Sequence, residues 1–204
     1  MSLAGLREQV VETLRRLEAA GLVHGTSGNV SARDPGSGLI AVSPTSLPYG
    51  RMTAGDVSVV DADGRVLEGA PPSVELAMHV AVLAGRPDAG AVVHTHSPYA
   101  TAIGLVADEI PVVLAEQAAA AGGPVPVVPY AATGKPAMGE TVLAAGTWAV
   151  VVRNHGPVCL GRDLDAALRC ALAVEEGARA YALACQLGEP ALLPAAELER
   201  LRGR

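Results

Sequence analysis

Apolar residues near the start of the chain recur every three or four positions, with charged and polar residues between them. Because one helical turn takes 3.6 residues, this spacing puts the apolar set on one face of an amphipathic helix. Gly21 follows the set and is typical of a helix C-terminus. The set consists of Leu3, Leu6, Val10, Leu14 and Leu17.

Further along, short apolar runs are separated by turn signals. Asp63 and Gly64 lie between two such runs and predict a β-hairpin. Ser73 and Asp163 each precede a helical pattern and are suited to cap it. The expected elements are strands at 38–44, 89–97, 147–156 and 157–161, a hairpin at 56–69, helices at 74–85, 136–146 and 164–188, a short helix or irregular segment at 100–110, a glycine-rich loop at 24–34, short extended pieces around an alanine-rich turn at 110–130, and a short or frayed helix in the tail 189–204.

The order of these elements predicts the fold class. Hairpins mix with helices, so the chain does not alternate strictly between strand and helix. That order favours an α/β sandwich with a mainly antiparallel or mixed sheet over a doubly wound parallel sheet. The 204 residues are 50% hydrophobic, with no internal repeat and no linker. We therefore expect a single domain over 1–204.

Composition limits the classes of binding partner that we expect for this protein. The net charge is −6 and the basic residues are scattered, so no nucleic-acid or anionic-membrane surface is indicated. Charges interrupt the N-terminal apolar positions, unlike in a signal peptide. Cys159, Cys170 and Cys185 are widely spaced and indicate reduced, buried thiols in a cytoplasmic protein. Lys135 is the only lysine, so a covalent lysine mechanism has one candidate.

Two histidines end the apolar run "AVVHTHS". On a strand, His94 and His96 would share a face, and a divalent cation would satisfy both imidazoles. Alone, this pair is more often a hydrogen-bonded or core pair. His155 follows a second buried run and strengthens the metal interpretation, whereas the alternative makes it an ordinary loop residue. Neutral imidazoles suit Zn²⁺, with Mn²⁺, Fe²⁺ and Co²⁺ as alternatives.

Small residues and one carboxylate accompany these histidines. The stretch "GTSGNVS" at 25–31 has the glycines and hydroxyls of an anion-binding nest, and "SPTSLPYG" at 43–50 adds Thr45 and Ser46. By themselves, these two stretches are more often ordinary tight turns. Glu75 either caps a helix through the helix dipole or serves as a metal ligand or general base. His79, four residues later, shares its helix face and is predicted to be a core or supporting histidine.

Seven stretches taken together carry a family resemblance: "GTSGNVSAR", "VSPTSLPY", "PPSVE", "AVVHTHS", "AAAGG", "VPYAATG" and "RNHG". In this order they resemble the class II aldolase/adducin head family, and its fuculose-phosphate aldolase branch most closely. The resemblance implies a three-layer α/β/α sandwich around a mainly antiparallel sheet. It also implies a homotetramer with active sites at the subunit interfaces.

The resemblance also implies roles for residues. His94, His96 and His155 match the zinc ligands of the family. Glu75 matches the acid that ligates the free metal and becomes the catalytic base when substrate binds. A further set falls where the family holds the substrate phosphate: Thr26, Gly28, Asn29, Thr45, Ser46 and Ser73.

Some positions depart from the family pattern. The aldolases often carry a tyrosine before the alanine-glycine turn, where this chain has Ala115 or Glu116, and another in the C-terminal tail, where this chain has none after Tyr181. Glu116 is either a replacement acid or a solvated helix-end residue. Ser46 stands where glycine is usual and Val74 where a second serine is usual, so the phosphate site has one hydroxyl fewer beside Ser73.

The resemblance implies a zinc-dependent aldolase that cleaves a small ketose phosphate, such as fuculose 1-phosphate, through a metal-stabilised enediolate. The resemblance leaves open a sugar-phosphate 4-epimerase, a methylthioribulose-phosphate dehydratase and a sugar-acid phosphate decarboxylase. A non-catalytic adducin-like scaffold is disfavoured because the histidines and Glu75 are present. A metallohydrolase has no support beyond the metal site.

Overall fold

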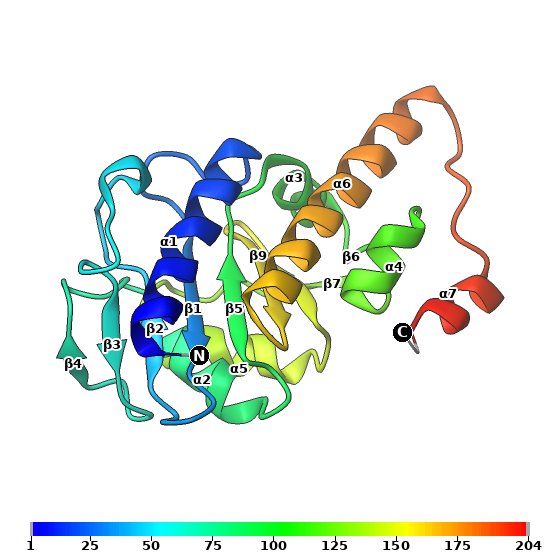
Figure 1. The fold of residues 1–204 in the computed structure, drawn as a ribbon. Helices are drawn as coiled ribbons and strands as arrows, with labels where there is room; N and C mark the ends of the chain where they lie inside the picture. The colour runs from blue at the N-terminus through cyan, green and yellow to red at the C-terminus, as the bar shows by residue number, and fades with distance from the viewer. Residues whose placement is uncertain (1, 203–204) are drawn as a thin grey trace.

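The computed structural model describes residues 2–202 as a mixed sheet covered by helices (Figure 1). In these residues nine strands follow the order β4-β3-β2-β1-β5-β9-β8-β7-β6. Neighbouring strands are antiparallel except β7 and β8, which are parallel. The strands are β1 (Asn29–Arg33), β2 (Ile40–Val42), β3 (Ser58–Val60), β4 (Val66–Glu68), β5 (Ala91–His94), β6 (Glu109–Ile110), β7 (Val125–Val128), β8 (Ala149–Val152) and β9 (Gly156–Gly161).

The helices cover both faces of this sheet, with α1 and α6 in front of it and α2 and α5 behind it in Figure 1. The helices are α1 (Leu3–Ala19), α2 (Leu76–Gly85), α3 (Pro98–Val106), α4 (Ala115–Ala121), α5 (Pro136–Ala144), α6 (Leu164–Leu187) and α7 (Ala195–Arg202), with a 3-10 turn, η1, at Tyr49–Arg51.

Two large apolar clusters form most of the core, one on each side of the sheet, and a small third cluster joins Val112, Ala118 and Leu201. Val93 belongs to the cluster shared with α1, α3 and α6, whereas its neighbour Val92 belongs to the cluster shared with α2 and α5. Val151 and Val150 divide in the same way. Both faces of β5 and β8 are therefore buried, which explains why these strands are continuous apolar runs instead of alternating ones.

Helix capping follows the sequence at two sites. The Asp163 side chain accepts a hydrogen bond from the backbone N–H of Ala166 at 2.7 Å and caps α6, as predicted. Gly21 has a φ of 73° just after α1, in the left-handed region that favours glycine. Ser73, in contrast, does not cap α2. That helix begins at Leu76 with Glu75 as its cap residue, and the Ser73 hydroxyl accepts from the backbone N–H of Glu75 at 3.2 Å.

Other expectations were wrong in detail. The glycine-rich loop expected to reach residue 34 gives way to β1 at Asn29, because pairing with β2 and β5 orders this segment. The alanine-rich turn within 110–130 is the helix α4, in keeping with the high helix propensity of alanine. Cys159 and Cys170 are buried, but Cys185 is exposed.

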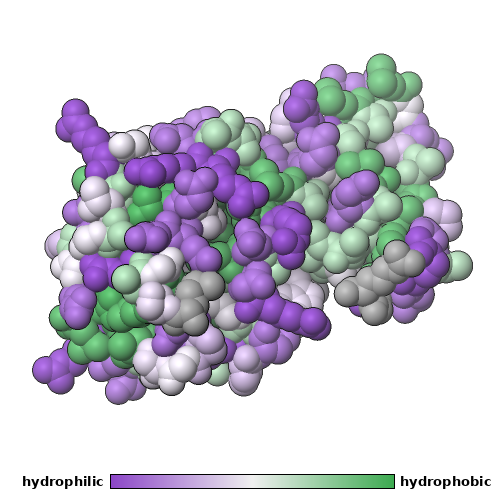
Figure 2. Space-filling view, in the orientation of Figure 1, coloured by the Kyte–Doolittle hydropathy of each residue, from purple (hydrophilic) through white to green (hydrophobic). Residues whose placement is uncertain are grey.

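Surface polarity is uneven. Figure 2 shows strongly hydrophilic side chains over α1 and weakly apolar ones where Figure 1 places α4 and the adjoining part of α6. Within residues 2–202, no helix has both the length and the apolar character needed to cross a membrane.

Candidate metal centre and active-site cavity

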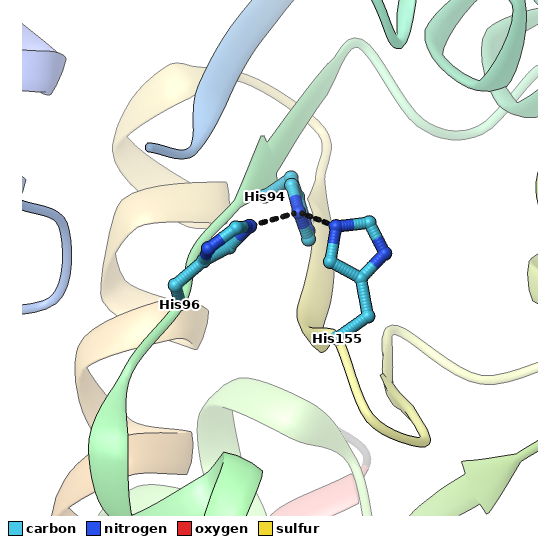
Figure 3. A group of neighbouring side chains, drawn as sticks. All are labelled: His94, His96 and His155. Carbon is cyan, nitrogen blue, oxygen red and sulfur yellow. Dashed lines mark hydrogen bonds between the residues drawn. The ribbon is translucent and has the colours of Figure 1, made fainter. Parts of the chain in front are cut away.

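Three histidines from two parts of the sheet meet at one point (Figure 3). His94 is the last residue of β5, His96 lies in the loop that follows, and His155 lies in the turn between β8 and β9. The strand was expected to extend through His96 but ends two residues earlier. The loop is held by two backbone hydrogen bonds, from Thr95 N–H to the Pro157 carbonyl at 3.0 Å and from His96 N–H to the Leu22 carbonyl at 3.2 Å.

The spacing of the imidazole nitrogens suits a tetrahedral ion. The Nε2 atom of His94 lies 3.1 Å from that of His96 and 3.3 Å from that of His155. Zinc–nitrogen bonds of about 2.0–2.1 Å at tetrahedral angles would separate two ligand atoms by about 3.3–3.4 Å. The observed separations are close to this value, so the side chains are already arranged for ligation.

The tautomer of His94 leaves the lone pair of its Nε2 atom facing the point where the three histidines meet. Its Nδ1 lies 2.8 Å from the Pro157 carbonyl oxygen, which can only accept a hydrogen bond, so Nδ1 carries the proton. Nε2 is then unprotonated, because burial lowers the pKa of His94 to about 3, against the opposing charge of Glu75. Burial also lowers the pKa of His96. A neutral imidazole is the form that binds a metal.

Glu75 completes the cluster from the first turn before α2. It is 2% exposed, with Oε2 at 3.3 Å from His94 Nε2 and Oε1 at 3.2 Å from His155 Nε2. Burial opposes its ionisation, but His155, His94 and the side-chain amide of Asn29 outweigh burial and lower the pKa of Glu75 to about 2. The carboxylate is therefore ionised at neutral pH.

The donor set fits a divalent cation. The single lone pair of His94 Nε2 faces two other imidazole nitrogens and an ionised carboxylate oxygen, which has no proton to donate, so these close contacts cannot all be hydrogen bonds. Glu75 Oε1 and His155 Nδ1 are buried atoms without a hydrogen-bond partner. A cation at the centre would satisfy the facing lone pairs and the carboxylate charge together.

A cavity of about 190 Å³ opens above this centre. Glu75, His96 and His155 line it, while His94 lies fully buried beneath them. All six residues expected to hold a phosphate also line it: Thr26, Gly28, Asn29, Thr45, Ser46 and Ser73. Ser27 and Thr133 contribute further hydroxyls that sequence reasoning did not single out, although both lie within the motifs that carried the resemblance.

Backbone contacts hold the cavity loops. Gly28 has a φ of 81°, and a Cβ there would lie 2.8 Å from the His94 carbonyl oxygen, so this close approach needs glycine. The buried Tyr49 hydroxyl donates to the backbone carbonyls of Ser27 and Gly28, the latter at 3.2 Å, and sequence reasoning missed this support. Ser46 has a φ of 57°, which explains why glycine suits that position.

Two other candidates lie elsewhere. Glu116 is exposed on α4 and lines a different groove, with Ala119, Arg169 and Leu172. Lys135 is exposed just before α5 and does not line the cavity of the metal centre. Of the residues proposed for chemistry, the structure therefore groups Glu75 with the three histidines and leaves Glu116 apart from them.

Comparison with known proteins decides the family. The family model described as "Class II Aldolase and Adducin N-terminal domain" matches residues 8–182. The chain belongs to the class II aldolase and adducin family. A class II aldolase is a metal-dependent lyase, and the three-histidine group of this chain is a possible site for that metal.

Relatives within this family are similar over nearly their whole length. The chain is 36% identical to the 5-methylthioribulose-1-phosphate/5-deoxyribulose-1-phosphate aldolase of Rhodospirillum rubrum, covering 96% of this chain and 89% of that protein. It is also 36% identical to the L-ribulose-5-phosphate 4-epimerase of Salmonella paratyphi B, covering 93% and 89%. Among solved structures, an L-fuculose 1-phosphate aldolase matches with a TM-score of 0.91 and 30% identity, covering 98% and 95%. These matches support the class II aldolase fold and an enzyme acting in sugar-phosphate metabolism.

Proposed function

We propose that this chain is a zinc-dependent aldolase that cleaves a small ketose 1-phosphate, such as fuculose 1-phosphate or a 5-deoxypentulose 1-phosphate, by retro-aldol chemistry. The observation that carries the proposal is the convergence of three imidazole nitrogens and the Glu75 carboxylate beneath a hydroxyl-lined cavity. The relatives named as aldolases for ketose 1-phosphates support this substrate class. We also propose that the helices on the two sheet faces form the three-layer α/β/α arrangement of the family.

The phosphate would bind at the rim formed by the loops 26–29, 43–46 and 73–74. Thr26, Thr45 and Ser73 offer hydroxyls there, and Gly28 and Ser46 expose backbone at positive φ. A residue at positive φ can turn the backbone N–H groups of its loop toward an anion. Val74 is 64% exposed and lines the same cavity, so the rim has an apolar side chain where a serine is usual.

Glu75 would manage the proton at the carbon next to the carbonyl. When the C3–C4 bond of the ketose breaks, its electron pair moves into the C2–C3 bond, and the C4 hydroxyl loses its proton as the aldehyde forms. The ionised Glu75 accepts this hydroxyl proton on Oε1 and then delivers it to C3, giving dihydroxyacetone phosphate and the aldehyde with the carboxylate regenerated. A bound divalent cation would supply Lewis-acid stabilisation of the negative charge that develops on the ketose oxygens.

A lysine route is a poor fit. Lys135 is exposed and does not line the cavity, so it is not placed to form a Schiff base with a ketose bound there. A non-catalytic scaffold is also disfavoured, because burying the Glu75 carboxylate against His94 and His155 costs desolvation energy that a scaffold has no need to spend. The second candidate is a sugar-phosphate 4-epimerase, which the similarity to such an enzyme favours; dehydratase and decarboxylase variants share the same enolate chemistry.

Deuterium exchange tests the proposal. The zinc-loaded protein would be incubated with dihydroxyacetone phosphate in heavy water, and loss of one C3 proton followed by NMR, with a chelated sample as the control. Chelator-sensitive exchange is the expected result. Glu75→Gln should keep the fold but reduce exchange by at least about 100-fold, because it removes the base. No exchange with zinc confirmed bound would reject this donor and favour the epimerase, dehydratase or decarboxylase reactions.

We further propose that the protein is cytoplasmic and forms a homotetramer with active sites at subunit interfaces. The groove of about 610 Å³ between α4 and α6 is mainly apolar, and Val106 and Leu187 are 86% and 90% exposed. Exposed apolar surface of this kind is typical of protein–protein interfaces. Light scattering after size exclusion should give four times the chain mass of 20.6 kDa, and a monomer would reject this assembly.

A further inference from the structure

Behind Glu75 lies a network of buried polar side chains, Asn29, His79 and Ser31, that the proton transfer step itself does not require. Ser31 and His79 are fully buried and Asn29 is 7% exposed. Asn29 and Ser31 lie two residues apart on β1, and Glu75 and His79 lie four apart around the first turn of α2. Both spacings put the two residues of each pair on one face, so the strand and the helix present their polar pairs to each other.

The hydrogen bonds run in one direction. The side-chain N–H of Asn29 donates to Glu75 Oε2 at 2.8 Å, since a carboxylate can only accept. That contact fixes the orientation of the amide, so Asn29 Oδ1 must accept from His79 Nε2. The remaining ring nitrogen, Nδ1, then accepts from the Ser31 hydroxyl at 2.7 Å.

This order determines the state of His79. It is a neutral imidazole with its proton on Nε2, and burial, which lowers its pKa to about 4, agrees with that state. A histidine that only filled space would leave two ring nitrogens to desolvate among apolar neighbours such as Met78 and Val82, which a leucine would avoid. Here both ring nitrogens of His79 have partners, and the network ends at the Glu75 carboxylate.

The two oxygens of Glu75 are consequently unequal. Oε2 accepts the hydrogen bond from Asn29, whereas Oε1 is buried without a hydrogen-bond partner and faces the metal centre, 3.2 Å from His155 Nε2. Fixing one oxygen prevents the carboxylate from rotating and leaves the other for the substrate proton.

We propose that His79 is a positioning residue for the Glu75 base: through Asn29 it holds Oε2 in place and reserves Oε1 for proton transfer at the substrate carbon. The part that concerns proton transfer rests on the aldolase function proposed above. The part that concerns the hydrogen-bonded network does not depend on the aldolase function. Asn29 serves here as the connecting group between α2 and the carboxylate, in addition to lining the cavity.

The first test needs no substrate. The metal-free protein, labelled with ¹⁵N in histidine, should show His79 with a protonated Nε2 and a bare Nδ1 near pH 7. The opposite tautomer or an imidazolium would overturn the assigned direction. A crystal structure of His79→Leu should show Glu75 rotated away from Asn29, and an unchanged Asn29–Glu75 contact of 2.8 Å would overturn the positioning role.

The second test compares three variants in the deuterium-exchange assay at equal zinc content. His79→Leu removes the donor to Asn29, whereas His79→Gln keeps an N–H that can reach Asn29. Met78→Leu changes a fully buried neighbour of similar volume on the same helix and is the control. The rate at saturating dihydroxyacetone phosphate should fall about 10–100-fold in His79→Leu. It should recover most of that loss in His79→Gln and stay within twofold of wild type in the control. KM should change less than twofold throughout.

The outcomes separate the two proposals. His79→Leu that folds and exchanges like the control would overturn the positioning role, as would a change confined to KM. If His79→Leu does not fold, His79→Gln and the tautomer of the wild type decide the question. If wild type itself does not catalyse exchange, the donor proposed for the aldolase is wrong, while the tautomer and the His79→Leu structure still decide whether His79 positions Glu75.

Discussion

Gly156→Ala should disrupt the metal centre without touching a ligand. Gly156 opens β9 next to His155, and a Cβ at this position would lie 2.2 Å from the backbone oxygen of Thr95 and 3.3 Å from the Cα of His96. The two segments that carry the histidines are therefore in backbone contact at this glycine. An added methyl group must push them apart, and the neighbouring atom is a carbonyl that cannot move alone.

The size of the effect follows from this contact. Ordinary van der Waals contact begins at 3.4 Å, so the segments must separate by about 1 Å. Metal–ligand bonds tolerate only about 0.2 Å, so His155 can no longer bind at full strength with His94 and His96. We expect zinc affinity to fall about 100-fold or more. Overpacking should also cost about 1–3 kcal/mol of unfolding free energy, or about 2–12 °C in the melting temperature of the metal-free protein.

Competition with a chromogenic chelator measures the affinity, and calorimetry of chelated protein measures the melting temperature. Gly50→Ala is the matched control, because nothing lies within 4 Å of a Cβ at Gly50. It should leave zinc affinity unchanged and shift stability by less than about 0.5 kcal/mol. Equal zinc affinity in the two variants would refute the reasoning that this backbone contact sets the position of His155.

Three further predictions concern stability. Burial lowers the pKa of His79 to about 4, so below its ordinary value of 6.5 the unfolded chain binds a proton that the folded chain does not. The contribution of this group to the free energy of unfolding should thus be fully present above pH 6.5 and fall by up to about 3 kcal/mol as the pH drops to 4. Urea unfolding of chelated His79→Gln should show a free energy of unfolding that depends less on pH than that of chelated wild type. Parallel pH curves for the two proteins would contradict this. Wild type in free zinc at 100 times its zinc dissociation constant should lose about 5–10 °C of melting temperature when the zinc is chelated. His155→Ala should show no such loss at the same zinc concentration. An equal loss in that variant would exclude His155 as a ligand. The buried Glu175 carboxylate accepts from the backbone N–H groups of Tyr99 and Ala100, each at 2.9 Å, so Glu175→Ala should cost about 1–2 kcal/mol and speed amide exchange at the start of α3; the same loss in the exposed neighbour variant Glu176→Ala would argue against capping.

Several features could be predicted from the sequence because local physics decides them. The period of 3.6 in the first 17 residues and the Asp163 cap correctly predicted α1 and α6. The Asp63–Gly64 turn likewise predicted the hairpin of β3 and β4. The ordered motifs also predicted the family, since their joint occurrence is far more specific than any single motif.

Other features depend on partners that are distant in sequence. The segment Asn29–Arg33 has no strong strand pattern of its own, and it becomes β1 only because β2 and β5 supply hydrogen bonds on both edges. His96 was expected to share a face with His94 through strand alternation. The strand ends first, and the Leu22 carbonyl, 74 positions earlier, holds the loop instead.

The sequence by itself determined which groups are available for chemistry: three histidines, one candidate base and a set of small hydroxyl residues. Only the tertiary structure decided that Glu75 faces the histidines, that Asn29 and His79 support it from behind, and that Glu116 lies in another groove. The physical reason is one of range. Periodicity and capping act within one or two turns of chain, whereas the direction of a buried hydrogen bond is set by which strands and helices pack together.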